Sequence, residues 1–334
     1  MNPSDLSTLK ELRQKVGRTF HYTLEGERCV ELNLTSDEYL YQGLIRHHSA
    51  DEKMDILKLV SRLTGLKALN LRRNRVFKLP PDFRSLRELE QLNLGSNYLG
   101  GVPAEISAFS RLKYLHLGNN DIAELPAFLG EFQNLEYLTL HKNLKLKSVQ
   151  ALAGLNSLKA LNLYFLNLGG RLPACIYEFK NLVTLTLWNI KDLSDELREL
   201  KNLEFFSNCG CPSLREAPAV IAKLKKLRMI RLFQNNLEKI PDAYGELENL
   251  EQISFYQNRL STLPDSFARL SKLKKLNLGW NSFEVLPAWL GQIRTLEWLA
   301  VFENPLRESN DLGLPPTTQV LRTWPFSTLA PHHS

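Results

Sequence analysis

A nine-residue pattern, L-x-x-L-x-L-x-x-N, constrains the fold of this 334-residue chain more than any other feature. The segment from Leu112 to Asn120 is one copy, and within each of two groups the closing asparagines are 23 residues apart. These closing residues are Asn74, Asn97, Asn120, Asn143, Asn235, Asn258, Asn281 and Asn304. Self-similarity at such a period is typical of a solenoid, in which each repeat buries its apolar surface only against its neighbours.

The register of the pattern continues through a central region in which the asparagine is missing. Copies there close at Leu166, Ile190 and Cys211, and an outlying first copy from Cys29 to Asp37 closes with aspartate. We therefore predict about twelve repeats, spanning residues 28–304.

Two properties of the motif predict its local structure. Apolar residues alternate with other residues in its last part, as in a half-buried strand, so the leucines point inward and the residues between them point outward. The closing asparagine carries two donors and an acceptor, and we expect it to pair with backbone groups exposed by the following turn. Cys211 could replace asparagine as a weaker donor, whereas Leu166 and Ile190 cannot.

A proline follows most copies of the motif, and an apolar residue such as Phe83 or Ile106 stands three positions after it. The prolines are Pro80, Pro103, Pro126, Pro173, Pro218, Pro241, Pro264 and Pro287. Proline suits the first turn of a short helix because its φ is already near the helical value. We predict a short helical return on the outer side of each repeat.

Together these motifs resemble the leucine-rich repeat proteins of the intracellular type, whose repeats read L-x-x-L-P-x-x-Φ-x-x-L-x-x-L-x-x-L-x-L-x-x-N. The resemblance covers about Arg28 to Asn304. It implies an α/β solenoid, a right-handed leucine-rich repeat horseshoe, with a parallel β-sheet on the concave side and a cap at each end.

Three segments lie outside the regular repeats. Residues 1–27 are expected to form an N-terminal helical cap, with a helix from about Ser4 to Val16. An insertion at about residues 38–60 ends in a predicted helix that Ser49 could cap. Its first part is an irregular loop that contains Tyr39, Tyr41, His47 and His48, for which binding and simple looping are equally open. Residues 305–334, with Trp324 and Phe326, are expected to form a C-terminal cap and tail.

Composition and targeting signals narrow the function classes. The net charge of +6 is modest and basic residues alternate with acidic ones, which argues against nucleic-acid binding. The four cysteines form no paired clusters, so we expect no disulfide, no metal site and a reducing, cytoplasmic location.

The sequence has neither a signal peptide nor a membrane-spanning stretch, so we expect no membrane association; delivery into another cell without a cleavable signal is the alternative location. Catalytic motifs and glycine-rich phosphate loops do not occur, and we expect neither a cofactor nor enzymatic activity.

The outward-facing residues of the strands carry the functional hypothesis. From about His141 to Tyr256 the position after the last leucine of each motif is mostly aromatic, and neighbouring outward positions add further rings and two arginines. The predicted partner-binding residues are His141, Tyr164, Trp188, Phe205, Phe233, Tyr256, Tyr137, Tyr114, Arg72 and Arg231. Exposed apolar stripes mark interfaces, and tyrosine, tryptophan and arginine dominate interface energies.

We therefore predict a monomeric, non-catalytic module that binds an unidentified protein through this aromatic stripe. Three other interpretations stay open. The rings could form a ladder that stabilises the sheet, they could stack on a carbohydrate or another small ligand, or the chain could be a regulatory adaptor for an enzyme on a separate chain.

Overall fold

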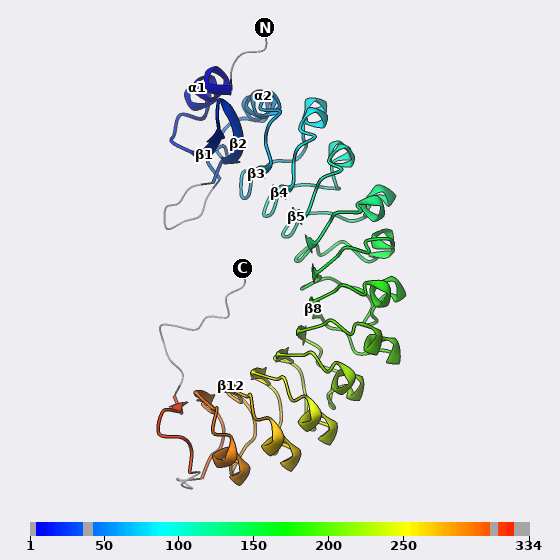
Figure 1. Ribbon diagram of the computed structural model, residues 1–334, viewed down its shortest axis with the longest axis vertical. Helices are drawn as coiled ribbons and strands as arrows, with labels where there is room; N and C mark the ends of the chain where they lie inside the picture. Colours follow the sequence, from blue (N-terminus) through cyan, green and yellow to red (C-terminus); the bar gives the residue numbers. More distant parts are fainter. Residues whose placement is uncertain (1–4, 36–42, 308–312, 324–334) are drawn as a thin grey trace. The chain divides into compact units, whose positions relative to one another are not determined.

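The computed structural model describes residues 5–35, 43–307 and 313–323. The chain forms two compact units. The first comprises Met1–Leu168 and Pro173–Asn181, and the second comprises Gly169–Leu172 and Leu182–Ser334. Figure 1 shows that within each unit the strands lie on one side and the short helices on the other.

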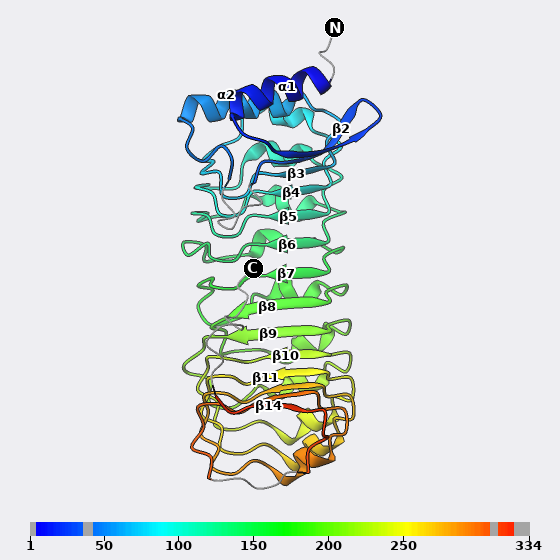
Figure 2. The same ribbon diagram turned by 90° about the vertical axis from the view of Figure 1, so that its left-hand side faces the viewer.

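In the first unit each regular repeat contributes one short strand, and neighbouring strands are parallel. Their register follows the sequence repeat, since Leu69 pairs with Leu92 and Leu92 pairs with Leu115. Figure 2 shows these strands side by side. They are β3 (Ala68–Asn70), β4 (Gln91–Asn93), β5 (Tyr114–His116), β6 (Tyr137–Thr139) and β7 (Ala160–Asn162). The predicted inward leucines are buried in this unit, as Leu92 and Leu115 illustrate.

Short helices return the chain on the other side of the first unit, as the proline pattern predicts. They are 3-10 helices: η1 (Pro81–Ser85), η2 (Ala104–Ala108), η3 (Ala127–Glu131), η4 (Gln150–Leu152) and η5 (Ala174–Glu178). The motif proline stands directly before the helix rather than in its first turn, for example Pro103 before Ala104. The apolar residue three positions after it, Phe83 or Ile106, is fully buried. In η4 the residue before the helix is Val149, and this helix has only three residues.

Two α-helices pack together near the N-terminus. The first is α1 (Asp5–Val16), which buries Leu9, Leu12 and Val16. The second is α2 (Ala50–Ser61), which begins with the predicted cap: Ser49 Oγ accepts from Glu52 N at 3.2 Å, and Ser49 N donates to Glu52 Oε2 at 2.7 Å. This reciprocal pairing satisfies two amide groups that the helix itself leaves free. Both predicted helices are therefore confirmed, while Tyr39 and Tyr41 lie outside the described residues.

An antiparallel hairpin stands at the start of the sheet, and its second strand also pairs in parallel with β3. This second strand falls in the predicted first copy of the motif, whereas the first strand was not predicted. The hairpin consists of β1 (His21–Glu25) and β2 (Arg28–Asn33), with Tyr22 opposite Leu32. Gly26 has a φ of 62° in the two-residue connection, a conformation that glycine adopts without the steric penalty of a side chain. Strand β1 lies before residue 28, where the sequence carries no repeat signal and where only the helix from about Ser4 to Val16 was predicted.

The asparagine column is paired as predicted in both units. Asn97 Oδ1 accepts from Asn74 N at 3.0 Å and Val76 N at 2.9 Å, and Asn97 Nδ2 donates to Leu71 O and Leu94 O. In the second unit, Asn281 Nδ2 donates to Phe255 O and Leu278 O in the same way. Each asparagine therefore ties its own turn to that of the preceding repeat.

Where the motif lacks its asparagine, another one substitutes. Asn208 is fully buried, its Nδ2 donates to Ile190 O at 2.6 Å, and its Oδ1 accepts from Ile190 N at 3.2 Å. Cys211 does not take over the asparagine's role, because its thiol lies 3.5 Å from Ser213 Oγ instead. The sequence analysis missed Asn208 because it stands three positions before the motif position that Cys211 occupies.

The second unit repeats the architecture of the first. Its parallel strands are β8 (Thr184–Trp188), β9 (Phe205–Cys209), β10 (Met229–Arg231), β11 (Gln252–Ser254), β12 (Lys275–Asn277), β13 (Trp298–Ala300) and β14 (Gln319–Leu321). Its 3-10 helices are η6 (Asp195–Glu199), η7 (Ala219–Lys223), η8 (Asp242–Glu246), η9 (Asp265–Arg269) and η10 (Ala288–Gln292). Strand β14 pairs with β13 although the sequence periodicity ends at Asn304. Trp324 and Phe326 lie outside the described residues.

Candidate functional site

The sheet face of each unit is the surface formed by the side chains that alternate with the buried leucines. Ten residues on these faces are predicted to bind a partner. Arg72, Tyr114, Tyr137, His141 and Tyr164 belong to the first unit, and Trp188, Phe205, Arg231, Phe233 and Tyr256 belong to the second.

Two tyrosines on adjacent strands contact each other on the sheet face of the first unit. The ring centroids of Tyr114 and Tyr137 are 6.5 Å apart, and Tyr137 keeps 43% of its surface exposed. Burial raises the pKa of Tyr114, and the nearby charge of Arg72 partly opposes that rise. This part of the face therefore combines phenol rings with a cation.

Two histidines form a second contact on the same face. The rings of His116 and His141 meet edge to face with centroids 5.3 Å apart. Gly118 N donates to His116 Nδ1 at 3.2 Å, so that nitrogen carries no proton. Burial lowers the pKa of His116 to about 3 and that of His141 to about 4, and neighbouring positive charges contribute to both shifts. Both imidazoles are therefore neutral at pH 7 and act as aromatic rings rather than cations.

Tyr164 does not have the exposure that the sequence analysis expected. Only 8% of its surface is exposed, because the ring of Phe165 packs edge-on against it with centroids 4.5 Å apart. Phe165 remains partly exposed, and Lys142 Nζ lies 5.8 Å from its ring centroid. The accessible ring at this repeat is therefore Phe165.

The sheet face of the second unit carries a cation stacked on a ring. The guanidinium of Arg231 lies 5.3 Å from the ring centroid of Phe205, within the range of a cation–π contact. Arg231 is exposed, and Phe205, Phe233 and Trp188 are each partly exposed. Tyr256 is partly exposed as well, and its ring centroid lies 6.1 Å from that of Phe302.

Glycines on the sheet faces let some rings lie flat against a neighbouring strand. A Cβ atom at Gly118 would collide with the ring of His141, and one at Gly279 would collide with the ring of Phe302. Phe302 is consequently only 4% exposed. The sequence contained this signal, because in both cases an aromatic or imidazole side chain stands at the same motif position one repeat after the glycine. The ring of Phe302 is therefore packed against the sheet, whereas the ring of His141 keeps part of its surface exposed.

Two further findings concern the described parts of the chain. Among residues 5–35, 43–307 and 313–323, no helix is both long and apolar enough to cross a membrane. Within the same ranges, no group of three or more His, Cys, Asp or Glu side chains is arranged to hold a metal ion.

Two family models match the sequence. One, described as a leucine-rich repeat region, matches residues 45–170, and the other, described as leucine rich repeat, matches residues 225–283. No curated protein matches the sequence.

Several solved structures share the fold. A leucine-rich repeat protein of Leptospira interrogans is 27% identical with a TM-score of 0.63, over 79% of this chain and 74% of that one. The internalin InlF of Listeria monocytogenes is 19% identical with a TM-score of 0.71, over 95% and 87% of the two chains. The Arabidopsis receptor kinase HAESA, solved with the peptide hormone IDA and the co-receptor SERK1, is 21% identical with a TM-score of 0.64, over 90% of this chain and 57% of that one.

Proposed function

We propose that this chain, which belongs to the leucine-rich repeat family, is a non-enzymatic interaction module that binds a protein through the aromatic and arginine side chains of its sheet face. The observation that carries the proposal is the contact of Arg231 with Phe205, beside the partly exposed rings of Trp188, Phe233 and Tyr256. Arginine, tryptophan and tyrosine are the residue types that contribute most to binding energy at protein interfaces.

The structural relatives support a protein as the ligand. HAESA was solved with a peptide hormone and a co-receptor bound, so a protein that shares this fold takes peptide and protein partners. A solenoid also suits this task because its repeats present a long, continuous row of side chains. On the sheet face of the first unit, Tyr114, Tyr137, Arg72 and His141 are the corresponding candidate contacts.

The aromatic side chains alone account for modest affinity. If a partner covered on the order of 300 Å² of apolar surface on Trp188, Phe205, Phe233 and Tyr256, the gain would be roughly 7 kcal/mol at about 25 cal/mol/Å². The loss of translational and rotational freedom costs about 4–15 kcal/mol. Tight binding therefore requires polar contacts too, and exposed Arg231 is the candidate for a charge-assisted hydrogen bond to an acidic partner residue.

The proposal is tested by affinity capture from a lysate of the source organism. The bait proteins are the wild type, a Phe205→Ala/Phe233→Ala variant, and a control variant with Leu144→Ala and Val285→Ala. The control removes apolar side chains that are 70% and 51% exposed but do not lie on a sheet face. We expect a protein that the wild type and the control both capture, and that the sheet-face variant captures at least tenfold less.

Folding of each bait is checked by circular dichroism and thermal denaturation. If all three folded baits capture the same proteins equally, the rings form a stabilising ladder and the proposed interface is wrong. A cytoplasmic location belongs to the same proposal and is supported by the free, buried state of all four cysteines. A monomeric state belongs to the proposal as well. Light scattering should then give a mass near 38.4 kDa.

A further inference from the structure

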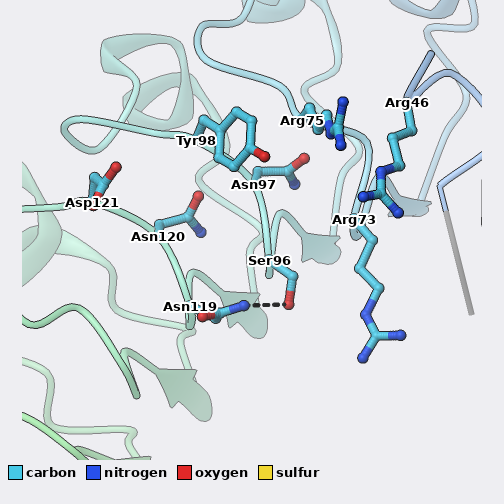
Figure 3. A pocket seen from close by; sticks show the side chains of 9 residues that line it. All are labelled: Arg46, Arg73, Arg75, Ser96, Asn97, Tyr98, Asn119, Asn120 and Asp121. Carbon is cyan, nitrogen blue, oxygen red and sulfur yellow. Dashed lines mark hydrogen bonds between the residues drawn. The ribbon is translucent and has the colours of Figure 1, made fainter.

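A pocket in the first unit contains three arginines that the proposed interface does not use. The pocket has a volume of about 430 Å³ and lies where the chain turns after β3, β4 and β5 (Figure 3). Arg46 reaches it from the segment before α2, and Arg73 and Arg75 reach it from the turn after β3. Figure 3 shows these three side chains on one side of the pocket, with Asp121 on the other side.

Two of the three arginines have a buried nitrogen that lacks a partner among the described residues. The Nε atoms of Arg46 and Arg75 are buried, and neither has a hydrogen-bond partner in the part of the chain that the structure describes. A buried donor without a partner is unfavourable, and more so when it is charged. Such a cost indicates a position at which an acceptor can bind.

A further cation increases the positive potential beside the pocket. Lys53 on α2 is only 9% exposed. Burial lowers its pKa, and the charge of Arg75 lowers the pKa further, which shows that the two cations lie near each other. An anion bound at the arginines would relieve this repulsion.

Among the described residues that line the pocket, the carboxylate of Asp121 pairs with a lysine. Asp121 Oδ1 lies 3.5 Å from Lys145 Nζ, and both side chains are more than 60% exposed. Asp121 therefore already has a cationic neighbour and sits on the opposite side from the arginines (Figure 3).

Neutral hydrogen-bonding groups complete the lining. Ser96 Oγ accepts from Asn119 Nδ2 at 3.1 Å, which leaves the hydroxyl proton of Ser96 able to donate. The hydroxyl group of Tyr98 also belongs to the lining, and Tyr98 is 57% exposed. An oxyanion in this pocket would thus meet charged donors on one side and hydroxyl groups beside them.

We propose that this pocket binds the dianionic phosphate group of a phosphate monoester, with Arg46 and Arg75 as the principal ligands and Arg73 beside them. The phosphate of a monoester has three terminal oxygens and a charge of about −1.5 to −2 at pH 7, whereas a carboxylate has two oxygens and one charge. Guanidinium groups match phosphate geometry through paired N–H donors. The site is separate from the sheet-face residues, so the proposal does not depend on the proposed protein interface.

The test is titration calorimetry of the full-length chain with phenyl phosphate, at pH 7.5 and low ionic strength. Phenyl sulfate and benzoate, which each carry a single charge, serve as comparison ligands. We expect saturable binding of phenyl phosphate, at least tenfold weaker binding of both monoanions, and at least tenfold weaker phenyl phosphate binding by an Arg46→Gln/Arg75→Gln variant. The control variant Arg84→Gln/Arg87→Gln removes the same charge from exposed positions of the first unit and should bind like the wild type.

A phosphoserine peptide and its unphosphorylated form distinguish the two sources of the group. Tighter binding of the phosphopeptide than of phenyl phosphate would place the phosphate on a peptide, and equal binding would indicate a small metabolite; either result supports the site. Absence of phenyl phosphate binding to the wild type, equal binding to all variants, or equal binding of benzoate and phenyl sulfate would each overturn the proposal. If the double variant does not fold, the Arg46→Gln single variant carries the same expectation.

Discussion

At the scale of single residues, a glycine on one strand leaves room for an aromatic or imidazole ring of the next repeat to lie against that strand. A methyl group at Gly118 would collide with the ring of His141, so Gly118→Ala must displace that ring or the backbone. We expect a loss of about 1–3 kcal/mol in the free energy of unfolding, as for other overpacked sites. Urea denaturation monitored by circular dichroism measures it. Gly100→Ala is the matched control, because a Cβ atom there meets nothing within 4 Å and the stability should hardly change.

The buried histidines make stability depend on pH. The folded state holds His116 with a pKa of about 3, below the ordinary value of 6.5, so the unfolded chain binds a proton more readily as the pH falls. The contribution of His116 is complete above pH 6.5 and decreases towards pH 3. Between pH 6.5 and 5, where most carboxylates stay ionised, the loss is on the order of 2 kcal/mol.

The matched variant for this prediction is His116→Asn. Asn93, at the same motif position one repeat earlier, accepts from Gly95 N at 3.0 Å as His116 Nδ1 accepts from Gly118 N. The variant should therefore keep the hydrogen bond and show a smaller loss of unfolding free energy between pH 6.5 and 5. An unchanged pH slope would show that His116 is not the group responsible.

The role of a residue could be predicted from the sequence where the hydrogen-bonding groups of its side chain determine that role. The two donors and one acceptor of asparagine predicted the pairing of Asn97 with backbone groups of its own turn and of the preceding turn. The burial of Tyr164 was not predictable, because it depends on the direction in which the Phe165 ring packs. The pocket arginines were missed because Arg46 is distant in sequence from Arg73 and Arg75, and none of the three belongs to the aromatic stripe.

At the scale of elements, the asparagine column links each turn to the preceding repeat. Replacing Asn97 with leucine would leave the N–H groups of Asn74 and Val76 without their acceptor and the carbonyl group of Leu71 without the Asn97 donor. The carbonyl group of Leu94 would keep its bond from Asn120 Nδ2. We expect Asn97→Leu to lower the free energy of unfolding by about 3 kcal/mol or more.

Asn134→Leu is the control for the asparagine column. Asn134 is exposed and makes a single bond, from its Nδ2 to Ser110 O at 3.0 Å, so its loss should cost less than about 1 kcal/mol. Equal losses in the two variants, measured by urea denaturation, would contradict a special role for the column. The strands and 3-10 helices of the repeats follow from the motif itself, whereas β1 and β14 lie outside the predicted repeats and carried no periodic signal.

At the scale of the whole molecule, four free thiols report on how the solenoid opens. Cys29 and Cys175 lie in the first unit and Cys209 and Cys211 in the second, and all four are buried. Burial raises the pKa of Cys29 and of Cys209 to about 12, and a thiol must ionise before it attacks a disulfide reagent. We therefore expect almost no reaction with such a reagent at pH 8 in the native state, and reaction of all four cysteines in concentrated urea.

Intermediate urea concentrations distinguish cooperative opening from opening by parts. Because each repeat of a solenoid packs only on its neighbours, repeats near an end open more easily than interior ones. Both strands are paired on both sides, but Cys29 lies on β2 in the first predicted repeat, whereas Cys209 lies on β9 in one of the central repeats. We expect mass spectrometry after brief labelling to find Cys29 modified at a lower urea concentration than Cys209. If Cys29 and Cys209 instead become labelled with the same urea midpoint, the repeats open as a single cooperative structure. Each substitution considered above would then destabilise the whole chain rather than only its own repeat.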